Sequence, residues 1–211
     1  MSVHLRPEEI EAESFRIIDA EAGPHPWGPA EWQVVRRVIH TSADFDYARS
    51  MVMSPGVIGR GVAALRKGHG LVTDTTMALS GISRTRLDSF GISAACFVAD
   101  PLVARTAQKL GVTRSLMAMR TAAANPDNGI FVIGNAPTAL FELLRLVREE
   151  GLRPALVVGL PVGFVGAAES KEELLQAAGE FDIPFISNRG RKGGSNVAAA
   201  VMNALLILAM E

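Results

Sequence analysis

The feature that most constrains the fold is a repeating order of short apolar runs from Gly70 onward, each followed by a segment with helical spacing of apolar residues. The runs are apolar without alternation, which is typical of strands that are buried on both faces. Because helical segments separate them, the runs predict a parallel sheet with crossover helices. The expected strands are Leu71–Thr73, Ala94–Val98, Ile130–Ile133, Ala155–Val158 and Pro184–Ser187.

This pattern predicts a single domain over residues 1–211, built as a three-layer α/β/α sandwich on a mainly parallel five-stranded sheet. Such a fold is similar to flavodoxin and Rossmann folds. The helix expected at the C-terminus is nearly apolar all round, as for a helix buried against the sheet or against a partner. The expected helices are Pro29–His40, Gly56–Lys67, Pro101–Leu110, Arg114–Ala124, Pro137–Glu150, Ser170–Ala178 and Ser195–Met210.

Residues 1–33 lie outside this repeat and are expected to form an ordered N-terminal arm. Within the arm, Gly23–Pro29 is too rich in proline and glycine for regular structure. The stretch Glu11–Ile18 carries paired apolar residues that must dock, either on the same domain or on a neighbouring subunit. A loop is expected between Asp44 and Pro55.

The composition excludes several classes of protein. A net charge of −1 and a pI of about 6.4 give no general attraction to nucleic acid or to an anionic membrane. We find no signal-peptide core and no apolar run of membrane-spanning length, so a soluble cytoplasmic protein is expected. The single cysteine, Cys96, is expected to be a buried inert thiol. No histidine or cysteine pair has metal-ligand spacing, and we therefore expect no metal site.

The stretch Arg36–Asp46 holds the best candidate for acid/base chemistry. Histidine is the side chain best suited to exchange a proton without a metal, which makes His40 the candidate, and Arg36 and Arg37 just upstream could hold carboxylates. The alternative is that His40 only caps the C-terminal end of a helix whose buried side carries the neighbouring valines and isoleucine.

Several polar loops follow the expected strands, and in a parallel sheet such loops gather at one edge. The stretch Asn188–Ser195 places Arg189, Arg191 and Lys192 among glycines before a helix, which favours an anion site over a solvated turn. Gly134 and Asn135 offer a backbone turn and an amide, which could instead only cap a helix. The loop from Asp74 to Arg86 is rich in arginine and hydroxyl groups, and neither a Walker nor a dinucleotide fingerprint is present.

Taken as a set, four of these motifs resemble the precorrin-8X methylmutase family of cobalamin biosynthesis. The resemblance runs from about Glu11 to Leu206. The motifs that carry it are Arg37-Val-Ile-His40, Gly134-Asn-Ala-Pro-Thr-Ala-Leu140, Gly159-Leu-Pro-Val-Gly-Phe-Val-Gly-Ala-Ala-Glu-Ser-Lys171 and Asn188-Arg-Gly-Arg-Lys-Gly-Gly-Ser195.

The resemblance implies an isomerase that moves the ring-C methyl group of precorrin-8X from C11 to C12 and gives hydrogenobyrinic acid or its cobalt analogue. It implies no cofactor, and it places the family's catalytic histidine, the proton donor, on His40. The many carboxylates of such a corrinoid would be met locally by arginine and by helix N-termini. The residues expected to bind substrate are Ser14, Arg37, Thr85, Arg86, Arg120, Asn135 and Lys192.

Two other functions stay open on the sequence alone. A non-catalytic corrinoid carrier could use the same arginine loops but would not need His40, and a nucleotide-binding enzyme is disfavoured by its absent fingerprints. The apolar C-terminal helix and the aromatic residues of the arm also predict a homodimer with shared active sites, because a monomer would expose a large apolar patch.

Overall fold

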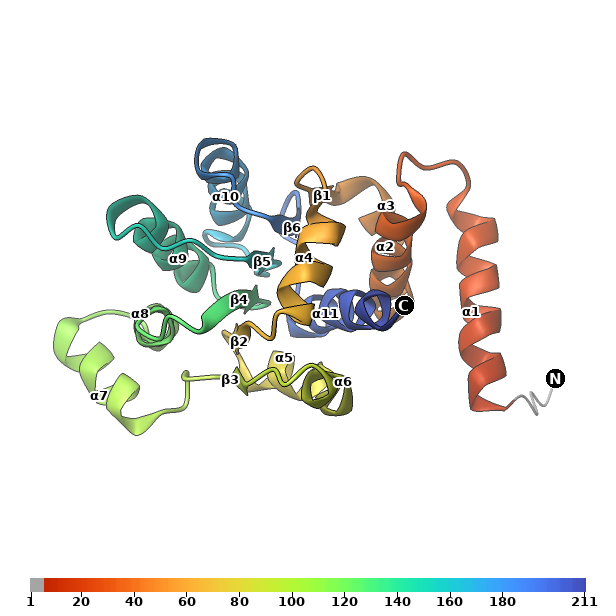
Figure 1. Ribbon diagram of the computed structural model, residues 1–211. Coiled ribbons are helices and arrows are strands. Elements are labelled where there is room, and N and C mark those ends of the chain that lie inside the picture. The colour runs from red at the N-terminus through yellow and green to blue at the C-terminus, as the bar shows by residue number, and fades with distance from the viewer. Residues whose placement is uncertain (1–5) are drawn as a thin grey trace.

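A mixed sheet forms the middle layer of the computed structural model, which describes residues 6–211 (Figure 1). In this part of the chain six strands pair in the order β1-β6-β5-β4-β2-β3, and all neighbours run parallel except β1 and β6. The central strands are fully buried, as their continuous apolar runs predict. The strands are β1 (Met51–Met53), β2 (Gly70–Thr73), β3 (Ala94–Ala95), β4 (Asn128–Ile133), β5 (Leu156–Gly159) and β6 (Phe185–Asn188).

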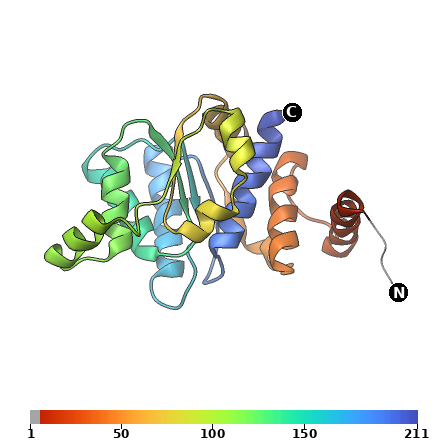
Figure 2. The same cartoon turned by 90° about the horizontal axis from the view of Figure 1, so that it is seen from below.

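Helices cover both faces of the sheet (Figures 1 and 2). One face is covered by α4, α5, α6 and α11, with α2 packed on the outer side of α11, and the other face by α8, α9 and α10, with α7 lying on α8. The outermost helix, α1, packs on α2. The helices are α1 (Pro7–Ala22), α2 (Pro29–Ser42), α3 (Tyr47–Ser50), α4 (Val57–Arg66), α5 (Thr76–Gly81), α6 (Arg84–Ser89), α7 (Pro101–Leu110), α8 (Arg114–Ala123), α9 (Pro137–Glu149), α10 (Ala167–Phe181) and α11 (Ser195–Met210).

The parallel strands have the topology of a flavodoxin-like doubly wound sheet. From β2 the chain moves outward to β3 and then returns past β2 to β4, so the direction of winding reverses between β2 and β4. In open sheets of this kind a crevice forms at that reversal, outside the ends of the two strands. We call the edge of the sheet at which the parallel strands end the carboxyl edge.

The predicted α/β/α sandwich is confirmed, but several details of the prediction are wrong. The expected loop 44–55 contains α3 and the antiparallel edge strand β1, so the sheet has one strand more than expected. Strand β3 is only two residues long, and Cys96 beyond it is half-buried rather than buried. Most of the described part of the N-terminal arm, residues 6–33, is the helix α1, and the loop from Asp74 to Arg86 contains α5 and the start of α6.

The apolar C-terminal helix does not need a partner to cover it. The sheet lies under α11, and α2, α4 and α5 pack around its other sides. Eleven of its residues are buried, Val201, Leu205 and Leu206 completely. The expectation that α11 leaves an apolar surface for a second subunit is therefore wrong, because its neighbours come from the same chain. Of the described helices, none combines the length and the apolarity that a membrane crossing requires.

Candidate active site

His40 opens into a pocket of about 210 Å³ between the last turns of α2, the end of α5 and the first half of α11. The neighbouring Val38 and Ile39 are buried in the core, which fixes the rotation of α2 and leaves His40 exposed. The pocket is lined by Arg37, His40, Thr41, Gly81, Asn196, Ala199, Ala200 and Asn203.

Helix α1 lies over the rim of this pocket. The ring of Phe15 meets the His40 imidazole edge-on, with 5.2 Å between ring centroids, and the guanidinium of Arg37 lies 5.2 Å from the same ring. Glu11 accepts a hydrogen bond from Arg37 at 3.1 Å. The expected contact residue Ser14 is on this helix beside Phe15, and its hydroxyl donates to the backbone oxygen of Ile10. The structure therefore brings Ser14, Arg37 and His40 into one region.

Asn203 ties the pocket to the expected binding residues of α6. Its side-chain oxygen accepts from the backbone N–H of Ser83 at 2.8 Å, and its amide nitrogen donates to the backbone oxygen of Gly81 at 2.8 Å. Thr85 and Arg86 follow Ser83 within the first turn of α6, where Thr85 is exposed and Arg86 half-buried. Both residues lie on the helix beyond the pocket and are not among its lining residues.

The cations of the loop 188–194 already have partners within the chain. Lys192 donates to Asp44 at 2.6 Å and to Asp46 at 2.7 Å, just beyond the end of α2. The hydrogen bond from Lys192 lowers the pKa of Asp44, and the two carboxylates raise the pKa of Lys192. Arg189 pairs with Glu172 at 2.8 Å, and Arg191 lies 5.6 Å from the Phe164 ring. An anion at this loop must therefore share its cations with acidic groups of the protein.

A buried lysine of α10 holds the loop 188–194 in place through hydrogen bonds. Lys171 of α10 is completely buried and donates to the backbone oxygen of Lys192 at 2.6 Å and to the side chain of Asn188 at 3.1 Å. Asn188 in turn donates to the same backbone oxygen at 3.0 Å. Desolvation lowers the pKa of Lys171 to about 8. These bonds fix the turn that carries Lys192.

Asn135 lies at the carboxyl edge, but its side chain is exposed and outside the His40 pocket. Its backbone N–H donates to the buried carboxylate of Asp74 at 2.9 Å. The preceding Gly134 packs so closely on the start of α11 that a Cβ there would lie 2.7 Å from the Cα of Ser195. In this way the 134–136 turn helps to place the pocket wall.

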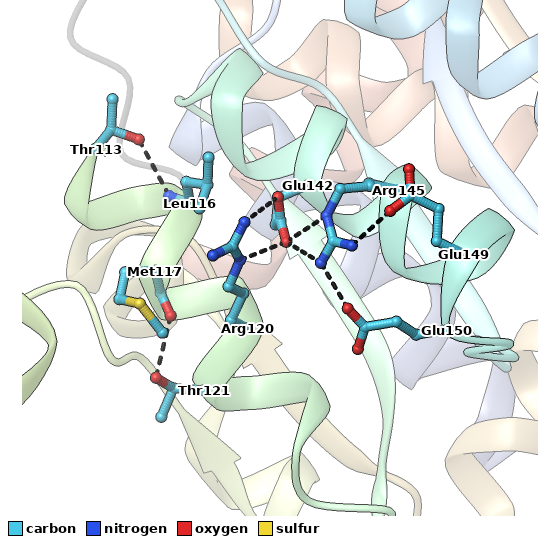
Figure 3. A network of polar contacts seen from close by, with 9 residues as sticks. All are labelled: Thr113, Leu116, Met117, Arg120, Thr121, Glu142, Arg145, Glu149 and Glu150. Carbon is cyan, nitrogen blue, oxygen red and sulfur yellow. Dashed lines mark hydrogen bonds and ion pairs between the residues drawn. The ribbon is translucent and has the colours of Figure 1, made fainter. Parts of the chain in front are cut away.

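Arg120 is the expected site residue that lies farthest from this arrangement. It is on α8, across the sheet from α2, in a network with Glu142 and Arg145 (Figure 3). Glu142, whose side chain is only 4% exposed, accepts from Arg120 at 2.7 Å and from Arg145 at 2.7 Å. Desolvation would raise the pKa of Glu142, but the two guanidinium groups lower it below its usual value. Within one chain the structure does not bring Arg120 together with His40.

Several residues of this region were not predicted from the sequence. Asn196 and Asn203 lie on the polar side of an otherwise apolar helix, and that interruption was the available signal for them. The pairing of Lys192 with Asp44 joins residues 148 positions apart, so local patterns carry no trace of it. For Lys171 the available signal was a lysine among small residues on the buried side of α10.

The geometry therefore combines an exposed imidazole, an arginine and two amides in one pocket. A precorrin-8X methylmutase family model matches residues 9–208. The chain belongs to this family. Methylmutases are isomerases, and so the chain is an isomerase.

Individual members of the family are similar over nearly the whole chain. The cobalt-precorrin-8 methylmutase of Priestia megaterium is 47% identical over 205 residues, which are 97% of this chain and 89% of that protein. The precorrin-8X methylmutase of Sinorhizobium sp is 38% identical over 192 residues, 91% of this chain and 90% of that protein. The crystal structure of precorrin-8x methyl mutase from Thermus thermophilus superposes with a TM-score of 0.85 at 42% identity, covering 95% of this chain and 97% of that one.

Proposed function

We propose that this methylmutase converts precorrin-8X, or its cobalt analogue, into hydrogenobyrinic acid or the corresponding cobalt compound by moving the ring-C methyl group from C11 to C12. Family membership over residues 9–208 supports the substrate class. The observation that carries the catalytic assignment is the exposed His40 imidazole in a pocket with Arg37, Asn196 and Asn203.

In the proposed mechanism His40 acts as a proton donor. Its imidazolium protonates a ring nitrogen or an adjacent carbon of the macrocycle, which draws electron density away from C11. The methyl group then leaves C11 and bonds to C12 in a [1,5]-sigmatropic shift, and the proton returns to His40. Atoms and electrons balance without an oxidant or a reductant. Proton transfer of this kind contributes about 10²–10⁴-fold, and the rest must come from holding the macrocycle in a reactive shape.

The size of the substrate supports a homodimer with shared active sites. Binding pockets for small molecules typically span about 300–1,000 Å³, whereas the His40 pocket measures about 210 Å³. A macrocycle with several carboxylate arms must extend beyond this pocket onto a further surface. In a homodimer with two-fold symmetry, a neighbouring subunit would supply that surface for each of two sites.

The position of Arg120 indicates which residue a neighbouring subunit would contribute to the site. Because Arg120 and His40 lie on opposite faces of the sheet, an Arg120 that binds substrate would serve the site of the partner and not its own. Helix α1 is the natural meeting point, since it packs on α2 on one side and exposes Ile10 and Ile17. Ser14, Thr85, Arg86, Asn135 and Lys192 would meet further substrate carboxylates and ring substituents around His40.

The test is turnover of precorrin-8X, followed by the change in the absorption spectrum as the conjugated system of ring C rearranges. We expect His40→Ala to lose about 10²–10⁴-fold in turnover while it still binds the product, because the carboxylate contacts remain. His69→Gln is the matched control, since His69 lies before β2 at the opposite edge of the sheet. Unimpaired turnover in His40→Ala would contradict the assignment and favour a corrinoid carrier.

A further inference from the structure

The crevice at the reversal between β2 and β4 holds a group of the protein itself. In open α/β sheets ligands bind in this crevice, and anionic groups are held there by backbone N–H groups that lead into a helix. Here the turn 134–136 leads from β4 into α9, a helix of 13 residues whose positive end points toward the crevice. Three consecutive N–H groups of this turn face the end of β2.

The carboxylate of Asp74, the first residue after β2, accepts all three of these hydrogen bonds. Oδ1 accepts from Gly134 at 2.9 Å, and Oδ2 accepts from Asn135 at 2.9 Å and from Ala136 at 2.7 Å. Asp74 is completely buried. Burial raises the pKa of the Asp74 carboxyl above its usual value, and the three hydrogen bonds offset only part of this rise. Among residues 6–211 no ion pair to Asp74 is found, so the backbone N–H groups of the turn stabilise its charge.

We propose that Asp74 is a built-in substitute for a bound anion: it occupies the anion position of the crevice and thereby positions the wall of the active-site pocket. The part of this inference that concerns turnover rests on the proposed function. It also gives a physical reason against nucleotide binding at this crevice, because a phosphate there would have to displace a buried carboxylate that already uses the available N–H groups.

The connection from Asp74 to the pocket runs through the start of α11. The turn that Asp74 holds contains Gly134, which packs directly on Ser195. The next residue after Asp74, Thr75, shares a hydrogen bond of 2.8 Å with the hydroxyl of Ser195. Ser195 is followed by Asn196, which lines the pocket beside His40. Asp74 is thus a positioning residue that acts through the loop and the helix.

The experiment replaces the built-in anion with a free one. Asp74→Ala removes the carboxylate and leaves three N–H groups facing a void that formate can fill. We expect this variant to lose at least about tenfold in kcat at a temperature well below its Tm, as for the loss of charge-assisted hydrogen bonds. Added formate should raise both Tm and kcat with saturation, while chloride at equal ionic strength should not.

Two further variants make the test specific. Asp74→Asn keeps the shape but turns an NH₂ group toward N–H donors, so we expect the same loss and no rescue by formate. Asp127→Ala, an exposed aspartate before β4, should match the wild type with and without formate. A purely structural role of Asp74 would lower Tm and leave kcat of the folded variant intact.

The inference is overturned if formate leaves the Tm of Asp74→Ala unchanged relative to chloride, or if Asp74→Asn turns over at the wild-type rate. Should Asp74→Ala fold only in formate, the dependence of its folding yield on formate supports the anion position. The formate-dependent Tm needs no substrate, so it stands apart from the proposed function. If the wild type fails to turn over precorrin-8X, the proposed function falls together with the turnover part of this inference, while the formate-dependent Tm still decides the anion position.

Discussion

Arginine lines several hollows of the described chain, and two of these hollows differ in how fully their arginines are already paired. The larger, about 580 Å³, lies at the ends of α8 and α9, where Arg145 contacts three carboxylates and shares Glu142 with Arg120 (Figure 3). The smaller, about 210 Å³, holds His40, and its arginine, Arg37, pairs with Glu11, an exposed residue of another helix. The difference shows that the volume of a hollow does not indicate where the active site lies. What matters is which polar groups stay available to a ligand.

The largest expected effect tests whether the two hollows meet in a dimer. His40→Ala and Arg120→Ala should each be nearly inactive alone. If each site combines His40 of one subunit with Arg120 of the other, mixing the two variants under subunit exchange should restore about a quarter of wild-type turnover.

The control mixes His40→Ala with Arg145→Ala. Arg145 was not expected to bind substrate. Absence of any restoration in the first mixture would show that Arg120 serves a structural network only. Light scattering decides the premise, since a fully active protein with a mass near 22.4 kDa at all concentrations would contradict a dimer.

The next effect concerns the loop 188–194, whose Lys192 pairs with residues just beyond the end of α2. We expect Lys192→Ala to weaken product binding by about 1.5–3 kcal/mol, because a charge-assisted contact is lost. Asp44 and Asp46 would also lose their cation and repel the substrate carboxylates. Calorimetric titration with the product measures this loss, and Lys109→Ala on α7 is the exposed control.

Adding Asp44→Asn to Lys192→Ala separates the two causes. Recovery of affinity in the double variant would assign the loss to repulsion by Asp44. An unchanged dissociation constant in Lys192→Ala itself would mean that the loop is a solvated turn.

A smaller effect is expected on the other side of the comparison. Glu142→Gln removes the nearly buried carboxylate that two guanidinium groups share, and we expect a loss of about 1–3 kcal/mol in the free energy of unfolding. Urea denaturation measures it. Glu149→Gln removes an exposed partner of Arg145 and should change stability by less than about 1 kcal/mol. Equal losses in the two variants would show that burial of Glu142 adds nothing to the network.

The last prediction is a pH dependence due to Lys171. Its pKa in the folded protein is lowered by desolvation from 10.5 to about 8, so between these values the unfolded chain binds more protons than the folded one. Stability should therefore rise with pH from about 8 to 10.5 relative to Lys171→Met, which lacks this group. Lys67→Met, at the exposed end of α4, controls for loss of a lysine. Parallel curves for wild type and Lys171→Met would refute the assigned shift.

The sequence predicted the sheet and most helices because burial on both faces leaves a strong mark on composition. The runs of β2, β4, β5 and β6 are such cases. It missed β1 because Met51–Met53 is an edge strand of three residues, paired antiparallel and only partly buried, which leaves no distinctive pattern. It misjudged α11 because apolarity shows that a helix is covered but not by what.

For the site, the sequence located the neighbourhood better than the contacts. His40, Arg37 and Ser14 share one region because α1 and α2 are consecutive helices. The partners of Lys192 and the place of Arg120 depend on tertiary packing, so charge patterns alone could not assign them. Asp74 was visible as an acid after a strand, but its hydrogen bonds to a turn 60 residues away were not.

Helix α1 has a consequence for the order in which this molecule opens. Its main packing partner is α2, with Phe15 and Ile18 in the shared core, whereas α11 is enclosed by the sheet and by α2, α4, α5 and α6. Segments with few buried contacts exchange their amide hydrogens through local opening long before the core unfolds. Near the site, α1 is such a segment. Its detachment would remove Phe15 from the His40 ring and release Arg37 from Glu11 while the sheet stays intact, so the surroundings of the imidazole are governed by local rather than global stability.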